Sequence, residues 1–218
     1  MTRLYRDWTL SCALGEFIGI GLAGIVATIM IAGMGEPQTP LEAWGAYAAM
    51  VAVGAVEGSA IGYFQWRVLR RLFPAMSARA WVGATLAVAV LGWAIGMLPS
   101  TLTAGAPQPQ AANAEPALWL ILLMSAGMGA GAGLVFGFAQ WLVLRRHAAH
   151  SAHWMLSNMG GWALAMAWIF LAASWPGETT SKLLVVLGGL AGGALAGLSI
   201  GAASGVSLLR LAALRHGD

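Results

Sequence analysis

The stretch that decides the fold is residues 54–71, which read GAVEGSAIGYFQWRVLRR and return at residues 129–146 as GAGAGLVFGFAQWLVLRR. Both stretches carry glycine at every fourth position, follow the glycines with Gln-Trp and end in two arginines. Trp8, Trp81 and Trp154 extend the pattern, since each opens an apolar run and lies 73 residues from the next. A period of this kind predicts an internal repeat of supersecondary units. We therefore expect three two-helix hairpin repeats of about 73 residues.

The third of these units is degenerate. When Gly205 is aligned with Gly62 and Gly137, the Gln-Trp pair of the first two units becomes Leu208-Leu209. Such divergence is expected where one side of a ring of three has a different task, or where one copy has simply drifted. The three units are predicted to form a single transmembrane domain, 1–218, with bounds 8–80, 81–153 and 154–218.

Composition excludes a water-soluble globular protein. Hydrophobic residues make up 59% of the 218 and charged residues only 9%, whereas about a quarter of the residues in soluble domains are charged. A helix needs about 20 apolar residues to cross a hydrocarbon layer about 30 Å thick, and six stretches of the chain are that long. We therefore predict an all-α integral membrane bundle of six transmembrane helices. The expected segments are 8–34, 44–69, 81–102, 117–144, 154–175 and 183–209.

The basic residues predict the orientation in the membrane. Ten arginines lie at the N-terminus, in the second and fourth connections and near the tail, while Lys182 alone lies on the other side. Since positive residues stay in the cytoplasm, both termini are predicted to be cytoplasmic in a bacterial inner membrane. The net charge of +3 then reflects orientation and not nucleic-acid binding. Anionic lipid headgroups are expected to contact a cytoplasmic rim made of Arg70, Arg71, Arg79, Arg145 and Arg146. The acids expected in the outer loops are Glu36, Glu42, Glu115 and Glu178.

Glycine at every fourth position gives the second, fourth and sixth segments a face of small residues. Two helix backbones approach closely along such a face and gain dispersion contacts that lipid does not match. The preferred interpretation is packing within the chain. The alternative is a face that receives another membrane subunit or a second copy of the chain. The helix-packing glycines are Gly54, Gly58, Gly62, Gly129, Gly133, Gly137, Gly197, Gly201 and Gly205.

Two acidic residues are predicted to lie inside the membrane. At 1.5 Å per residue, Glu16 lies about 12 Å beyond the start of its segment and Glu57 about 14 Å before Trp66. Both depths are near the middle of the bilayer, where an unpaired carboxylate is costly and usually functional. Two neighbouring carboxyls also suit proton exchange or cation coordination. The alternative is a structural role, either as a protonated pair or through hydrogen bonds to Ser59, Thr28 or a backbone carbonyl.

Gln65 and Gln140 precede Trp66 and Trp141 at the predicted cytoplasmic boundary. A side-chain amide at this depth bonds across helices or to a lipid headgroup, and packing is the preferred interpretation. The tryptophans are expected to be interfacial anchors before they are a site for a quinone or pigment. The predicted inner aromatic belt consists of Trp8, Trp66, Trp81, Trp141 and Trp154, and the outer belt of Trp44, Trp119 and Trp175.

Neither a catalytic residue nor a metal site is predicted. His147, His150 and His153 recur at every third position without a carboxylate or cysteine nearby, so a basic loop at headgroup level is expected instead. Ser204 has no histidine in any membrane segment to serve as a base. Cys12 is the only cysteine, which excludes an internal disulfide. No cofactor is inferred, and the sequence stays compatible with a bound lipid, quinone or pigment.

The pattern GxxxGxxQWxVLRR, present at 58–71 and 133–146, resembles one in a loose set of bacterial multi-pass membrane proteins without an assigned activity. The resemblance covers the second and fourth segments but little of the sixth, and it implies membrane placement alone. Two functions are therefore predicted. The first is a non-catalytic accessory or assembly subunit of a membrane complex, or a binder of lipid or a lipophilic cofactor. The alternative is a small proton- or cation-coupled transporter or channel that uses Glu16 and Glu57.

Overall fold

The computed structural model describes residues 1–105, 116–177 and 179–216, and within them it contains six α-helices and no strand. All six helices are long and apolar enough to cross a membrane. The prediction of an all-α six-helix membrane protein is thereby confirmed. The first helix begins earlier in the sequence than predicted, and the last one ends later. The helices are α1 (Thr2–Met34), α2 (Pro40–Leu72), α3 (Ala78–Thr103), α4 (Leu118–Leu144), α5 (His153–Ser174) and α6 (Lys182–His216).

Local sequence signals fix the two ends of α2. The Thr39 hydroxyl accepts a hydrogen bond from the backbone amide of Glu42, and the Glu42 carboxylate accepts one from the backbone amide of Thr39. This reciprocal capping box satisfies amides that lack a partner at a helix start. Arg70 and Arg71 lie in the last turn, where cations stabilise the negative end of the helix dipole. α2 therefore has a stabilising sequence signal at each end.

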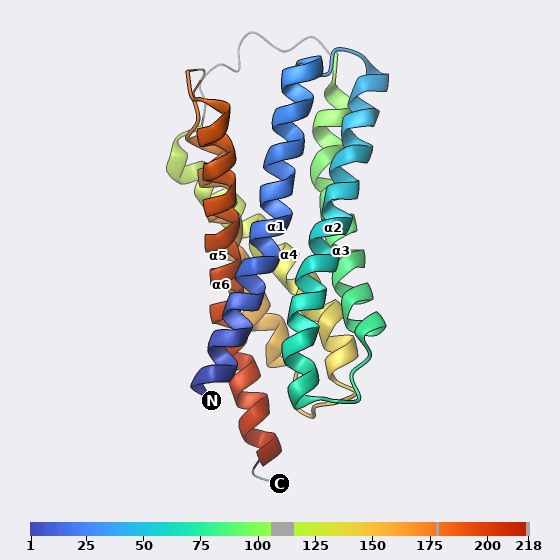
Figure 1. The fold of residues 1–218 in the computed structure, drawn as a ribbon, viewed down its shortest axis with the longest axis vertical. Helices are drawn as coiled ribbons and strands as arrows, with labels where there is room; N and C mark the ends of the chain where they lie inside the picture. Colours follow the sequence, from blue (N-terminus) through green and yellow to red (C-terminus); the bar gives the residue numbers. More distant parts are fainter. Residues whose placement is uncertain (106–115, 178, 217–218) are drawn as a thin grey trace.

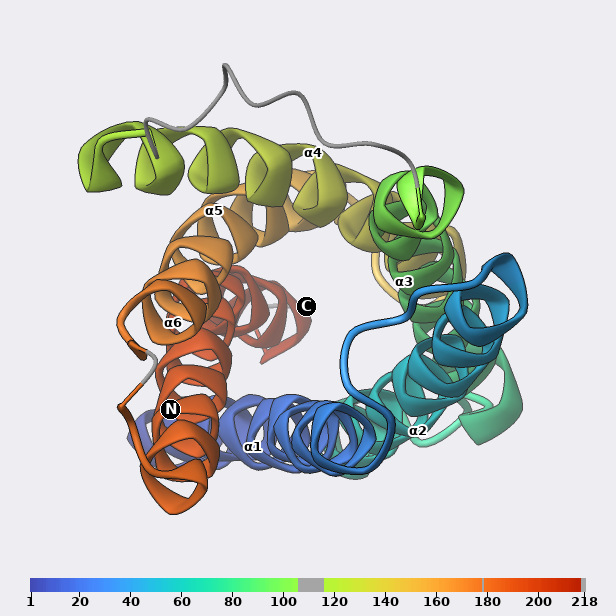
Figure 2. The ribbon, with the colours of Figure 1, turned by 90° about the horizontal axis from the view of Figure 1, so that it is seen from above.

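The six helices form a ring in which each helix lies beside the next one in the sequence, and α6 closes the ring against α1 (Figure 2). Both termini lie at the same end of the ring, together with the connections 73–77 and 145–152 (Figure 1). We call this the arginine-rich end, because Arg70, Arg71, Arg145 and Arg146 lie there. The opposite end contains the connection 35–39.

The glycine faces of α2, α4 and α6 pack on the helix that follows each of them around the ring. A Cβ atom added to Gly62 would lie 2.9 Å from Cα of Val82 on α3, and one added to Gly137 would lie 2.7 Å from Cα of Met155 on α5. At Gly197 the same atom would lie 2.5 Å from Cα of Ala13 on α1. Backbones that approach this closely leave no room for a side chain. These three contacts therefore join neighbouring predicted hairpins to each other.

The structure corrects the prediction for Trp8, Trp81 and Trp154. These three residues were expected to be interfacial anchors in the inner aromatic belt, but they are fully buried, at 0% exposure. The ring of Trp154 contacts Trp8 edge-on at a centroid distance of 5.5 Å and Trp81 at 5.9 Å. The three indoles thus fill the inside of the ring near the arginine-rich end. We refer to them as the tryptophan cluster.

The ring is least closed between α3 and α4, which make the smallest contact of any two neighbours. Figure 2 shows α4 starting on the far side from the end of α3. Trp119, Leu123 and Met124 in the first turns of α4 are 63–67% exposed, as expected for side chains that face lipid. Two of the acids predicted in the outer loops, Glu115 and Glu178, lie outside the described residues.

Candidate functional site

Glu16 of α1 and Glu57 of α2 lie together inside the ring, and we call them the carboxyl pair. The two residues are buried, at 0% and 4% exposure, and their carboxyl groups are close enough to interact electrostatically, while no hydrogen bond joins Glu16 to Glu57. Gly19 makes the approach possible, because a Cβ atom there would collide with Cγ of Glu57. The indole nitrogen of Trp93 on α3 donates a hydrogen bond to Oε2 of Glu57. Three helices therefore build the surroundings of this pair.

Glu16 has almost no polar surroundings. No group among the described residues forms a hydrogen bond with either carboxyl oxygen of Glu16. The polar residues considered from the sequence are not its partners, since the Ser59 hydroxyl donates to the Ala55 carbonyl and the Thr28 hydroxyl to the Gly24 carbonyl, each on its own helix. Burial of a polar group without a hydrogen bond costs roughly 1–3 kcal/mol in proteins, and more for a charged one. If the carboxyl pair had a purely structural role, we would expect its oxygen atoms to have more hydrogen-bond donors around them.

On the side of the carboxyl pair that faces the arginine-rich end lies a buried network of side-chain amides. Nε2 of Gln140 donates to Oε1 of Gln65 at 3.0 Å and lies 3.1 Å from Oγ1 of Thr85. Nε2 of Gln65 lies 3.5 Å from Sγ of Cys12 on α1. Gln65 and Gln140 therefore point into the ring and link α1, α2, α3 and α4. This arrangement was not evident from the Gln-Trp motif alone.

The tryptophan cluster continues this network. The indole nitrogen of Trp81 donates to Oε1 of Gln65 at 3.3 Å, and that of Trp154 donates to Oε1 of Gln140 at 3.0 Å. The third indole, that of Trp8, donates to the Ser204 hydroxyl at 2.9 Å. Ser204 lies one turn before Leu208, the residue aligned with the two glutamines. The third unit therefore supplies the acceptor for Trp8 of the first unit, from a position one turn earlier on the helix than that of the glutamines.

Ser204 is fully engaged in this contact. Its hydroxyl donates to the carbonyl of Ile200 at 2.6 Å while it accepts from Trp8. A serine nucleophile instead needs a base to take its proton. The hydroxyl thus completes a helix-to-helix contact between α1 and α6.

Trp66 and Trp141 are less buried than the glutamines that precede them. The Arg70 guanidinium lies 5.1 Å from the Trp66 ring, and that of Arg145 lies 5.0 Å from the Trp141 ring. Both tryptophans are half-buried. A cation over an indole face is attracted by the ring quadrupole. In each Gln-Trp pair the amide is therefore part of the buried network, whereas the indole contacts an arginine at the arginine-rich end.

The other arginines of the predicted rim are exposed as well, namely Arg71, Arg79 and Arg146. The guanidinium of Arg71 forms an ion pair with Asp7 of α1 at 2.7 Å. Exposed pairs of this kind stabilise a fold by at most about 1 kcal/mol. The pair ties the end of α2 to the start of α1.

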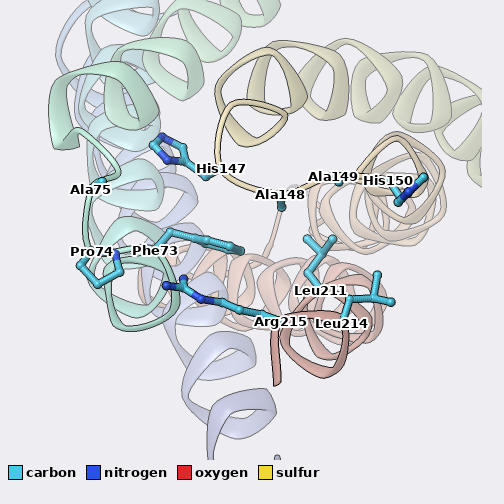
Figure 3. Close-up of a pocket in the computed structure, with 10 residues that line it drawn as sticks. All are labelled: Phe73, Pro74, Ala75, His147, Ala148, Ala149, His150, Leu211, Leu214 and Arg215. Atoms are coloured by element: carbon cyan, nitrogen blue, oxygen red, sulfur yellow. The ribbon is translucent and has the colours of Figure 1, made fainter. Parts of the chain in front are cut away.

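A cavity of about 620 Å³ opens at the arginine-rich end (Figure 3). His147, His150 and Arg215 line it together with the ring of Phe73. The Arg215 guanidinium lies 5.5 Å from the Phe73 ring. His153, the third histidine of the predicted loop, does not line the cavity, and its Nδ1 lies 2.9 Å from the His150 carbonyl.

A second cavity, of about 730 Å³, opens at the opposite end between α1, α2 and α3. We call it the outer cavity. Met50 of α2 and Met97 of α3 line its deep part and also belong to an apolar cluster with Val53 and Trp93. Since Glu57 lies seven residues after Met50, the carboxyl pair lies about 10 Å deeper than the cavity, at 1.5 Å per residue.

The inside of the ring is thus layered along α2, from the outer cavity at Met50 through Glu57 and Gln65 to Phe73 at the other cavity. An apolar layer separates the outer cavity from the carboxyl pair, and the tryptophan cluster lies between the amide network and the arginine-rich end. The chain matches no protein-family model, and no curated protein or solved structure is significantly similar to it.

Proposed function

We propose that this membrane protein is a small proton-coupled transporter, with Glu16 and Glu57 as its proton-binding site. The observation that carries the proposal is the position of Glu16, which is fully buried beside Glu57 with no hydrogen bond to its carboxyl oxygens within the described residues. Ionisable groups in the membrane interior are expensive, face the inside of a bundle and mark ion or proton pathways.

The pair has the chemistry that such a site needs. A carboxylate only accepts hydrogen bonds, so a bond between two carboxyls requires a proton on one of them. Like charges at contact distance also oppose each other, which favours the binding of one proton or one cation between them. The Trp93 indole adds a donor that stabilises charge on Glu57.

The layers on either side of the pair support a path that is closed in this conformation. Toward the opposite end the path meets Met50, Val53 and Met97, which are flexible or small apolar side chains. Toward the arginine-rich end it meets the amide network and then the tryptophan cluster. Transport requires these layers to open in turn around a fixed site, as in alternating access.

We also propose the orientation of the protein in the membrane. The arginine-rich end would face the cytoplasm of a bacterial cell, because positive loops remain on that side of the inner membrane. Both termini would then be cytoplasmic, and the rim arginines would contact anionic lipid headgroups. The threefold repeat is likewise proposed, on the grounds that each of the three glycine faces packs on the following helix.

The test is ion flux in liposomes that contain the purified protein and a pH-sensitive dye. A potassium gradient with valinomycin sets the membrane potential, and proton uptake is followed for the wild type, Glu16→Gln, Glu57→Gln and the double variant. Asp7→Asn removes a carboxylate at the arginine-rich end and serves as the matched control. We expect uptake above that of empty liposomes for the wild type and Asp7→Asn only. Uptake equal to that of empty liposomes, or an active double variant, would refute the proposal.

A second function, that of an accessory or assembly subunit, is favoured by the gap between α3 and α4. Exposed apolar residues at the start of α4, including Trp119 and Met124, offer a surface on which a helix of another subunit would complete the ring. A photo-crosslinking amino acid at position 119 would capture that subunit in native membranes. Mass spectrometry would then identify one recurrent protein. Capture of lipid alone would rule out this function.

A further inference from the structure

The outer cavity has an unusual combination of size, lining and charge. Its volume of about 730 Å³ is in the range of sites that enclose a drug-sized molecule. Its lining is rich in methionine and alanine, with the hydroxyls of Ser100, Thr101 and Thr103 among them. Among its lining residues, all of which are described, Glu36 and Glu42 are the charged ones, and none is Lys, Arg or His. The cavity is therefore apolar inside and negative at its mouth.

We propose that the outer cavity binds a lipophilic organic cation, and that this cation is the substrate of the transport proposed above. The inference thus rests on the proposed function and adds the substrate class to it. The acidic mouth attracts a positive charge and repels anions. The apolar interior then accommodates a hydrocarbon body, which a strongly hydrated metal ion does not have.

The methionines explain why an organic molecule fits better than a small ion. Met30, Met34, Met50 and Met97 all line the cavity. A thioether side chain is unbranched and polarisable, so it adapts to ligands of different shape. Flexible, methionine-rich surfaces are typical of proteins that bind many related ligands. A range of bulky cations is therefore expected to bind, and not one defined metabolite.

Trp93 connects the cavity to the carboxyl pair. It lies one helical turn before Met97, packs in the apolar cluster beside the cavity and donates to Glu57. Its ring lies against Gly54, where no side chain stands in its way. The indole face attracts an organic cation, and the carboxylate behind it neutralises the charge. Movement of this side chain, together with opening of the apolar layer of Met50, Val53 and Met97, would bring a cation from the cavity to Glu57.

The experiment measures binding of tetraphenylphosphonium to the full-length protein in lipid nanodiscs. Neutral triphenylphosphine oxide, of similar shape, tests the need for the charge. Ala46→Phe and Ala27→Phe each fill the cavity from a different helix, while Ala52→Phe places the same side chain at an exposed position of α2. Glu57→Gln removes the inner charge, with Asp7→Asn as its control. Thermal unfolding identifies any variant that fails to fold.

We expect saturable binding of tetraphenylphosphonium and at least about tenfold weaker binding of the neutral oxide, which corresponds to about 1.4 kcal/mol. A similar loss is expected for a folded Ala46→Phe or Ala27→Phe variant and for Glu57→Gln, and no change for Ala52→Phe or Asp7→Asn. The inference is wrong if the cation does not bind saturably, or if both cavity-filling variants bind it like the wild type. Proton flux without such binding would overturn the substrate class alone, whereas binding without flux would overturn the transport function.

Discussion

The indole nitrogen of Trp93 on α3 donates to Oε2 of Glu57 on α2, so an aromatic side chain of the apolar cluster beside the outer cavity is hydrogen-bonded to the carboxyl pair. This hydrogen bond links α2 and α3 inside the ring, in addition to the contacts along the glycine face of α2. We expect this bond to break when an ion reaches Glu57 from the outer cavity. The bond therefore couples access to the site with the environment of its carboxylate.

Trp93→Ala is expected to expose Glu57 to reagents from the outer cavity. Dicyclohexylcarbodiimide reacts with protonated carboxyl groups in apolar surroundings, and mass spectrometry of peptides locates the adduct. We expect Glu57 to be labelled several times faster in Trp93→Ala than in the wild type, because the indole no longer covers it. Trp168→Ala, which alters a tryptophan of α5 away from the pair, is the control. Equal labelling rates in the three proteins would show that Trp93 does not control access.

The helices and the carboxyl pair could be predicted from the sequence, because both depend on distance along the chain. An apolar run has a length, and Glu16 and Glu57 have depths that can be counted from the ends of their segments. The two helices of a hairpin run antiparallel, so residues at the same depth in the membrane lie side by side. To predict that the two residues are neighbours, the only rule needed for side-chain direction is that charged groups face the inside of the bundle.

The tryptophan cluster was missed because burial depends on the rotation of a helix about its axis. A tryptophan at the start of an apolar run is typical of an interfacial anchor, and nothing in Trp8 itself contradicts this. A signal was nevertheless present one turn later, where Cys12, Thr85 and Asn158 follow Trp8, Trp81 and Trp154 by four residues. Residues four apart share a helix face, so these more polar neighbours indicated a face that avoids lipid.

Replacement of Glu16 by glutamine separates a structural role from a functional one. The amide of Glu16→Gln donates to the Glu57 carboxylate, which satisfies both groups without a proton. We expect a melting temperature equal to or above that of the wild type, since 1 kcal/mol corresponds to about 2–4 °C for a chain of this size, together with loss of proton uptake. Intrinsic tryptophan fluorescence in detergent records the melting. A clear drop in melting temperature with flux intact would mark the pair as a packing device.

Closure of the ring by α6 and α1 is expected to depend on Gly197. In Gly197→Ala the added methyl group would lie 2.5 Å from Cα of Ala13, so the helices must separate. Overpacking of this kind costs about 1–3 kcal/mol. Gly160→Ala on α5, where no atom lies within 4 Å of the added Cβ, is the matched control and should be neutral or slightly stabilising. Equal unfolding midpoints for the two variants would contradict this packing as a source of stability.

Cysteine labelling tests the orientation of the ring in the membrane. In a Cys12→Ser background, single cysteines are placed at exposed Ala75, in the connection after α2, and at exposed Thr179, before α6. A membrane-impermeant maleimide applied to intact bacterial spheroplasts should label position 179 only, and it should label position 75 after the membrane is opened. The reason is that arginine-rich connections remain in the cytoplasm during insertion. Labelling of position 75 from outside would invert the predicted orientation, and the outer cavity would then open toward the cytoplasm.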